Sequence, residues 1–142
     1  GLHHSLIFDD ARLSDGTIFG QYGNLLELKP RMLSYGSFVW LQPLFGDGYA
    51  GQRIVNLLLH LGTCVAIFLL LKEILLSVEF PANTLSNPDF EASRRAALLV
   101  AVAIFAVHPV ASYAVGYLIQ RSIVMATLFS ALSCFAIARG FL

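Results

Sequence analysis

The sequence has little charge and few cysteines. Charged residues make up 13% of its 142 residues, and nine basic side chains balance nine acidic ones, which gives no support for nucleic-acid binding. The two cysteines, Cys64 and Cys134, each lie inside an apolar run, so we expect free thiols and no disulfide framework. No basic segment leads into a short apolar run near the start, so we expect no signal peptide.

Apolar residues, by contrast, are abundant. They make up 57% of the chain, and the mean hydropathy is +0.72. A soluble domain of this composition would leave too much apolar surface in water. Because lipid offers the backbone no hydrogen-bonding partners, we predict an all-α membrane protein.

The longest uncharged run lies between Arg53 and Lys72 and contains 18 residues. As a helix it would be about 27 Å long, close to the hydrocarbon thickness of a bilayer. Asn56 and His60 are its unexplained residues, because both are polar and they share one helical face. Two roles remain open for them: orienting groups around a site, or tying this helix to a neighbour.

The rest of the chain predicts two further spans and one short helix. We expect spans at 53–72, 94–117 and 122–139, with Pro109 kinking the second rather than ending it. Asn87 and Pro88 should cap the start of that second helix. Residues 31–44 are too short to cross a bilayer and predict an interfacial helix. Residues 1–52 would then be an extracytoplasmic loop carrying this helix, and residues 53–142 the transmembrane region.

Two groups of residues are candidates for chemistry. Asp9 and Asp10 can act as a general base or hold a divalent cation, or they can simply occupy a solvated turn or a helix N-cap. Adjacent histidines His3 and His4 point apart, so we expect no metal cage from them, and the sequence leaves any cofactor undetermined.

A second set of candidates is cationic or lies within the predicted spans. Basic residues near one membrane face can bind a lipid phosphate, or each can snorkel to water. Polar residues inside a span are either functional or make helix-to-helix hydrogen bonds. The cations are Arg31, Arg53 and Arg121, and the polar residues are Asn56, His60 and His108.

Several stretches occur in an order and spacing that resembles one family. They are 8–13, 29–35, 44–46, 53–60, 105–110, 114–115 and 120–121. This pattern resembles the N-terminal part of the GT-C-type membrane glycosyltransferases with C-terminal tetratricopeptide repeats, relatives of the protein O-mannosyltransferases. We therefore expect the chain to be the front portion of such a protein and inactive by itself.

The resemblance implies a site and an orientation. In that family an acidic pair in the first extracytoplasmic loop is taken as catalytic, and it maps onto Asp9 and Asp10. The implied donor is a sugar on polyprenyl or dolichyl phosphate, whose phosphate Arg31, Arg53 or Arg121 would hold. The N-terminal loop would face the periplasm or lumen and the C-terminus the cytoplasm.

A non-catalytic function remains an alternative to the enzyme hypothesis. The chain can be a structural transmembrane subunit of a larger membrane complex, since three helices cannot by themselves enclose a lipid-linked donor and an acceptor. The expected partners are membrane lipid, a lipid-linked sugar donor, and other transmembrane helices or subunits. A transporter is disfavoured because no predicted span carries Asp or Glu.

Overall fold

The computed structural model describes residues 32–45, 49–81 and 87–141, and nearly all of them are helical, with no strand among them. The all-α prediction is confirmed for this part of the chain. The elements in order are α3 (Met32–Phe45), α4 (Tyr49–Ser77), α6 (Pro88–Val107), α7 (Pro109–Gly116), the short 3₁₀ helix η2 (Leu118–Gln120) and α8 (Arg121–Phe141).

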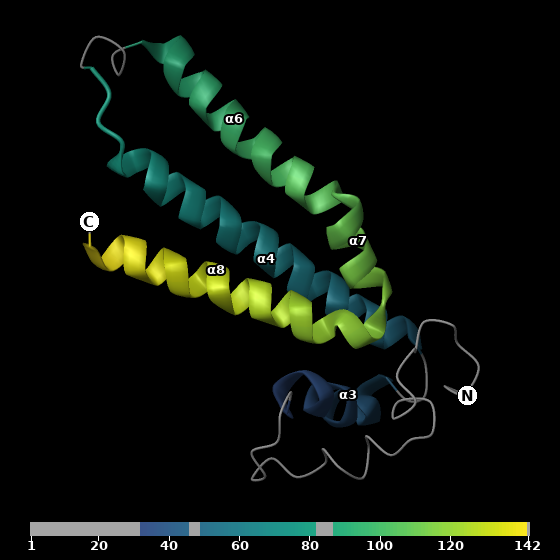
Figure 1. The fold of residues 1–142 in the computed structure, drawn as a ribbon. Coiled ribbons are helices and arrows are strands. Elements are labelled where there is room, and N and C mark those ends of the chain that lie inside the picture. Colours follow the sequence, from purple (N-terminus) through teal and green to yellow (C-terminus); the bar gives the residue numbers. More distant parts are fainter. Residues whose placement is uncertain (1–31, 46–48, 82–86, 142) are drawn as a thin grey trace.

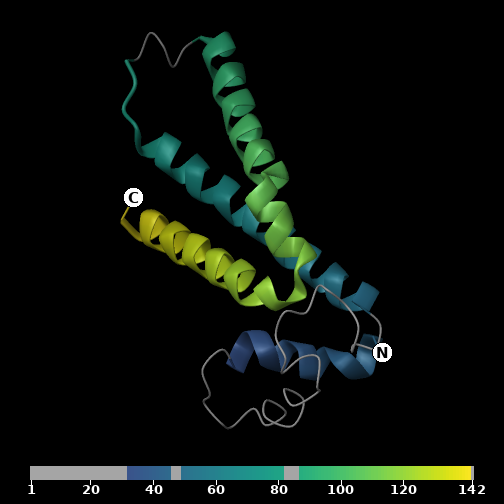
Figure 2. The ribbon, with the colours of Figure 1, turned by 45° about the vertical axis from the view of Figure 1, so that its right-hand side comes forward.

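Helix α4 is the centre of the arrangement, because it contacts each of the other described helices. Helices α4 and α8 run in the same direction, α6 and α7 return beside them, and α3 lies across the end where α4 and α8 begin (Figures 1 and 2). We call this end the Arg121 end. The opposite end, where α4 and α8 finish and α6 begins, is the Lys72 end.

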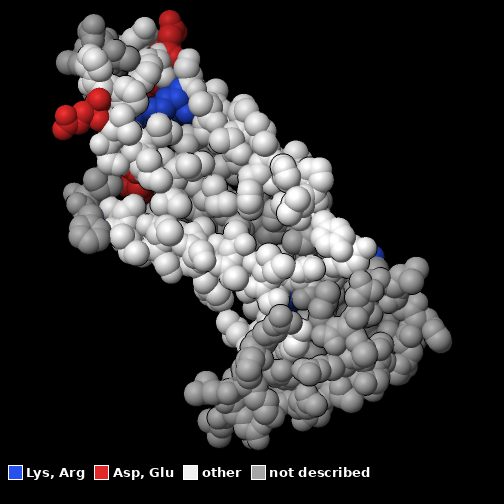
Figure 3. All heavy atoms as spheres, in the orientation of Figure 1, with Lys and Arg blue, Asp and Glu red and all other residues white. Residues whose placement is uncertain are grey.

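Two described helices are long and apolar enough to span a membrane. They are Ala50–Ser77 in α4 and Arg121–Gly140 in α8, with mean hydropathies of 2.4 and 1.7. In the most apolar 18-residue stretch of each helix, only 28% and 11% is buried within the described structure. Such low burial does not fit the core helices of a soluble protein. The middle of the face in Figure 3 shows no Lys, Arg, Asp or Glu side chain. These features indicate a membrane protein.

The second predicted span, 94–117, is not continuous. Helix α6 ends at Val107, His108 has a ψ of 134°, and α7 starts at Pro109. The expectation that Pro109 only kinks this helix is therefore wrong. Proline lacks an N–H to donate and pushes the preceding residue out of the helical region of backbone conformation, so the helix is interrupted at His108. Only 12 uncharged residues, 96–107, remain in α6, so a count of three spans is not confirmed.

Local signals placed the start of α6 and the extent of α3 well, and the ends of α4 less well. Asn87 caps α6 by accepting a hydrogen bond from the backbone N–H of Asp89 at 2.9 Å, and Pro88 occupies the first turn, as predicted. Helix α3 matches the expected short helix at 31–44, and Pro43 lies inside its last turn. Helix α4 is longer than the predicted span 53–72 at both ends.

Candidate functional site

The most distinctive feature of the structure is a buried arginine at the start of α8. Arg121 has no exposed surface. Its Nε donates to Asn56 Oδ1 at 2.7 Å, and its Nη1 donates to Ser37 Oγ at 2.9 Å. Its Nη2 donates to both the backbone oxygen and the side-chain Oε1 of Gln52, at 2.9 and 2.8 Å. Four of the five guanidinium N–H groups are therefore paired.

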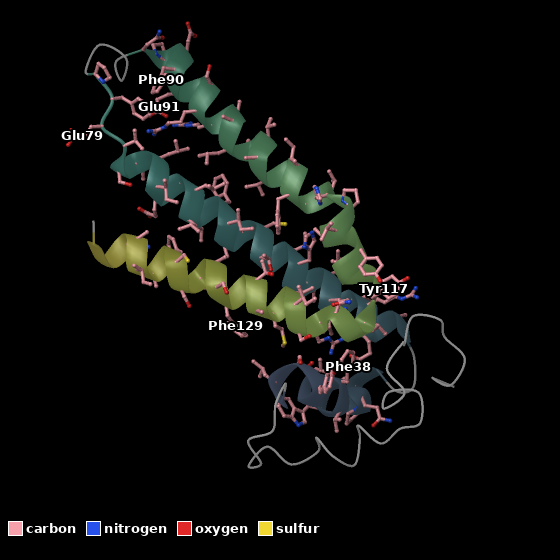
Figure 4. All side chains as sticks on the ribbon, viewed as in Figure 1. Phe38, Glu79, Phe90, Glu91, Tyr117 and Phe129 are labelled. Atoms are coloured by element: carbon pink, nitrogen blue, oxygen red, sulfur yellow. The ribbon has the colours of Figure 1, made fainter. Side chains whose placement is uncertain are left out.

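Arg121 also joins α3 to the helices above it. The guanidinium carbon lies 3.8 Å from the centre of the Phe38 ring, which Figure 4 shows on the side of α3 facing α8. Ser37 donates in turn to Ser34 O at 2.6 Å, and Gln52 Nε2 donates to Phe38 O at 3.4 Å. The network therefore holds one cation and three helices in a single geometry.

The charge of Arg121 is balanced without a carboxylate from the described residues. A cation at the first residue of a helix is disfavoured by the helix dipole, and burying it adds a desolvation cost. Neutral oxygen atoms from α3 and α4 and the face of an aromatic ring supply the compensation instead. Planar guanidinium geometry suits this set of acceptors, whereas a lysine ammonium does not.

Asn56 is the partner of Arg121 that connects the network to α7. It is fully buried, accepts from Arg121, and its Nδ2 donates to Val115 O in α7 at 3.4 Å. The structure thus gives Asn56 the helix-tying contacts that were one of its two expected roles.

His60 lies one turn further along α4. Its Nε2 makes a 3.1 Å hydrogen bond with Ala106 O, and its ring centre is 5.8 Å from that of Phe105. Gln52, Asn56 and His60 are spaced four residues apart and all are buried, so they form a polar stripe on one face of α4. This stripe ties α4 to α8, α7 and α6 in turn.

A pocket of about 280 Å³ lies beside His60, between α4, the break at His108 and the first turns of α8. Its walls are mostly apolar. Thr63 contributes from α4, Phe105 and Val110 contribute from the two sides of the break, and Val124 contributes from α8. The pocket therefore lies at the break between α6 and α7.

The remaining sequence-predicted site residues lie apart from this network. Arg53 is exposed on α4, and His108 is exposed at the pocket rim, where its Nδ1 accepts the Val110 N–H at 3.3 Å and caps α7. Three others, Asp9, Asp10 and Arg31, lie outside the described residues. The structure therefore brings together Asn56, His60 and Arg121 but leaves Arg53 facing outward.

Three members of the network were not predicted from the sequence: Ser37, Phe38 and Gln52. Gln52 had a detectable signal, because it precedes Asn56 by four residues and extends the same polar face. Ser37 and Phe38 had none, because nothing in α3 indicates that an arginine 84 residues away will pack on it.

Among the described residues, no group of three or more His, Cys, Asp or Glu side chains is placed to hold a metal ion. Comparison with known proteins adds no assignment, since no family model, curated protein or solved structure matches the chain.

Proposed function

We propose that the chain is the membrane-embedded front portion of a GT-C-type glycosyltransferase that takes its sugar from a polyprenyl- or dolichyl-phosphate donor. One observation carries this proposal: three of the stretches behind the resemblance, 53–60, 105–110 and 120–121, meet in space. Asn56 contacts Arg121 at 2.7 Å, and His60 contacts Ala106 at 3.1 Å. Stretches of sequence that belong to one motif set are expected to build one site.

The proposed topology uses three crossings. Helices α4 and α8 are the two that meet the length and hydropathy requirements, and α6 with α7 forms a broken third crossing between them. The Arg121 end then faces the periplasm or lumen, together with residues 1–52, and the C-terminus faces the cytoplasm. This arrangement puts the segment containing Asp9 and Asp10 on the side where the network lies.

The proposed chemistry needs a base and a cation. Asp9 or Asp10 takes the proton of the acceptor hydroxyl, whose oxygen attacks the anomeric carbon while the lipid phosphate leaves. Negative charge stays on the departing phosphate, and a nearby arginine stabilises it. Arg53 suits this role because it is exposed and lies one turn before Asn56, and Arg31 is a second candidate.

Arg121 suits a different role. Four of its N–H groups are already paired and its side chain is fully buried, so a phosphate reaches it only by displacing a partner. We assign it to positioning: it holds α3 against α4 and α8.

The pocket beside His60 fits a hydrocarbon segment of the donor. Its lining is mostly apolar, and its volume of about 280 Å³ is just under the range of roughly 300–1,000 Å³ typical of ligand sites. It therefore accommodates part of one chain rather than a whole lipid-linked sugar.

Transfer of labelled sugar from a polyprenyl-phosphate donor, measured with the full-length protein, tests the proposal. We expect the combined Asp9→Asn and Asp10→Asn change to abolish transfer, and Arg53→Gln to raise the KM for the donor. Asp15→Asn, which removes a carboxylate from the same segment, is the matched control and should keep transfer. Undiminished transfer in the Asp9/Asp10 variant would refute the assigned base.

A second candidate, a structural subunit, is favoured by the exposed apolar faces of the helices. Ile54, Leu58 and Val65 on α4 and Leu99 and Ile104 on α6 are all more than half exposed. Such faces contact either lipid or the helices of another protein. Stable co-purification with other membrane proteins, together with no transfer activity, would favour this role, whereas a monomer in mild detergent would exclude it.

A further inference from the structure

A second pocket lies at the Lys72 end, away from the network described above. It has a volume of about 380 Å³ and sits between the last turns of α4 and the first turns of α6. Phe80, three residues beyond the end of α4, makes an edge-to-face contact with Phe90 in the first turn of α6, and the two ring centres are 5.1 Å apart. Figure 3 shows charged side chains of both signs at this end of the molecule.

The rim of this pocket has more positive than negative charge. Three cations, Lys72, Arg94 and Arg95, line it with one carboxylate, that of Glu91. Glu91 pairs with Arg94 at 2.9 Å and faces Arg95 Nε at 3.8 Å. An adjoining hollow is lined by Arg94 together with Glu79 and Glu91, and the short ion pair with Glu91 makes Arg94 the cation that is already paired.

Two cations remain for a ligand. The Arg95 side chain is 80% exposed, and its contact with Glu91 is long. Lys72 is exposed and makes no ion pair with the residues that the structure describes. An anion that reaches this rim meets both side chains without having to break the short Arg94–Glu91 pair.

The inner part of the same pocket is apolar. It is formed by Phe68 from α4 and by Leu98 and Leu99 from α6. Lys72 ends the 18-residue uncharged run of α4, a place where basic side chains reach the headgroup level of a bilayer. The pocket thus presents cations at headgroup level and hydrocarbon side chains just inside.

We propose that this pocket binds one anionic phospholipid, with its phosphate on Lys72 and Arg95 and an acyl chain against Phe68, Leu98 and Leu99. Basic pockets between membrane helices recognise anionic headgroups in this way, at about a fivefold gain in affinity for each cation near the surface. The proposal requires only that α4 and α6 are embedded in a membrane and does not depend on glycosyl transfer.

Native mass spectrometry of the protein in mild detergent, titrated with phosphatidylglycerol or with phosphatidylcholine of identical acyl chains, tests this proposal. We expect phosphatidylglycerol to bind at least fivefold more tightly than phosphatidylcholine. Lys72→Gln and Arg95→Gln should each weaken phosphatidylglycerol binding about fivefold and leave phosphatidylcholine binding unchanged. Circular dichroism of each variant checks the fold, and Arg95→Gln is the safer change because its side chain is so exposed.

Arg139→Gln is the matched control. Arg139 lies in the last turn of α8, at the same end of the molecule, and does not line the pocket (Figure 1). Equal losses in Arg139→Gln and Arg95→Gln would show general charge attraction and overturn the proposal. Glycerol phosphate, which has no acyl chain, should bind far more weakly than phosphatidylglycerol. Equal binding of the two would mean that the site takes a soluble anion and would also overturn it.

Discussion

Replacing Arg121 with methionine and Asn56 with leucine, singly and together, tests the buried network directly. Arg121→Met removes the donor from four oxygen atoms but also removes a buried cation. Asn56→Leu leaves Nε of Arg121 without an acceptor and also loses the bond to Val115 O. Each single change should therefore destabilise the protein.

The magnitude follows from the 2.7 Å bond between Arg121 Nε and Asn56 Oδ1. Hydrogen bonds between membrane helices average about 0.6 kcal/mol and reach about 1.7 kcal/mol. Buried bonds to a charged group in soluble proteins contribute about 1.5–3 kcal/mol. We expect a coupling energy of about 1–2 kcal/mol, with the double variant less destabilised than the sum of the two single variants.

The chain offers a convenient assay for this coupling. Trp40 is its only tryptophan and lies on α3, so its fluorescence reports whether α3 stays docked, while circular dichroism reports all helices. In SDS titrations of detergent-solubilised protein, Arg121→Met should shift the Trp40 transition to lower SDS more than it shifts the circular dichroism transition. Arg121 contacts α3 through Ser37 and Phe38, which is the reason for the difference.

The control is a second double-mutant cycle, in which Arg121→Met is combined with Thr63→Val in place of Asn56→Leu. Thr63 is buried on the same helix, but its hydroxyl donates to Leu59 O of its own helix at 2.9 Å. It lies seven residues beyond Asn56, about 10 Å along the axis, so its effect should add to that of Arg121→Met. If the Asn56 cycle is also additive within about 0.5 kcal/mol, the proposed network is refuted.

Further predictions concern α3, the helix break and the exposed arginine. A Cβ on Gly36 would lie 2.5 Å from the Trp40 ring, so Gly36→Ala should displace that ring and change its fluorescence, whereas Gly116→Ala, with no atom within 4 Å, should not. Unchanged Trp40 emission would contradict this. Pro109→Ala restores a backbone N–H and removes a helix penalty of about 3 kcal/mol, so α6 and α7 should join, helical content should rise, and donor transfer should fall because the pocket wall moves. Transfer at the original rate in a straightened helix would exclude a role for the pocket. Arg53→Gln should change the free energy of unfolding in SDS by less than about 0.5 kcal/mol, since substitutions of exposed residues rarely cost more. A larger loss of stability would show that Arg53 has a structural role.

Helix positions could be predicted mostly from local sequence. The long uncharged run placed α4, and Asn87 with Pro88 placed the start of α6, because capping and apolar length act within one or two turns. At Pro109 the local sequence left the outcome open. A proline within a long apolar stretch is compatible with either a kink or a break, and the hydrogen bond between His108 Nδ1 and the Val110 N–H stabilises the break.

Composition and apolar run length are enough to predict a helical chain that is apolar enough for a membrane, and to identify Asn56, His60 and Arg121 as polar residues needing partners. The identity of those partners depends on how the helices pack. Arg121 bonds to residues 65, 69 and 84 positions away in the sequence, and no local pattern encodes contacts over such separations. A buried cation takes whichever acceptors the packing of three helices brings within hydrogen-bonding distance, and here these are amide, hydroxyl and carbonyl oxygens.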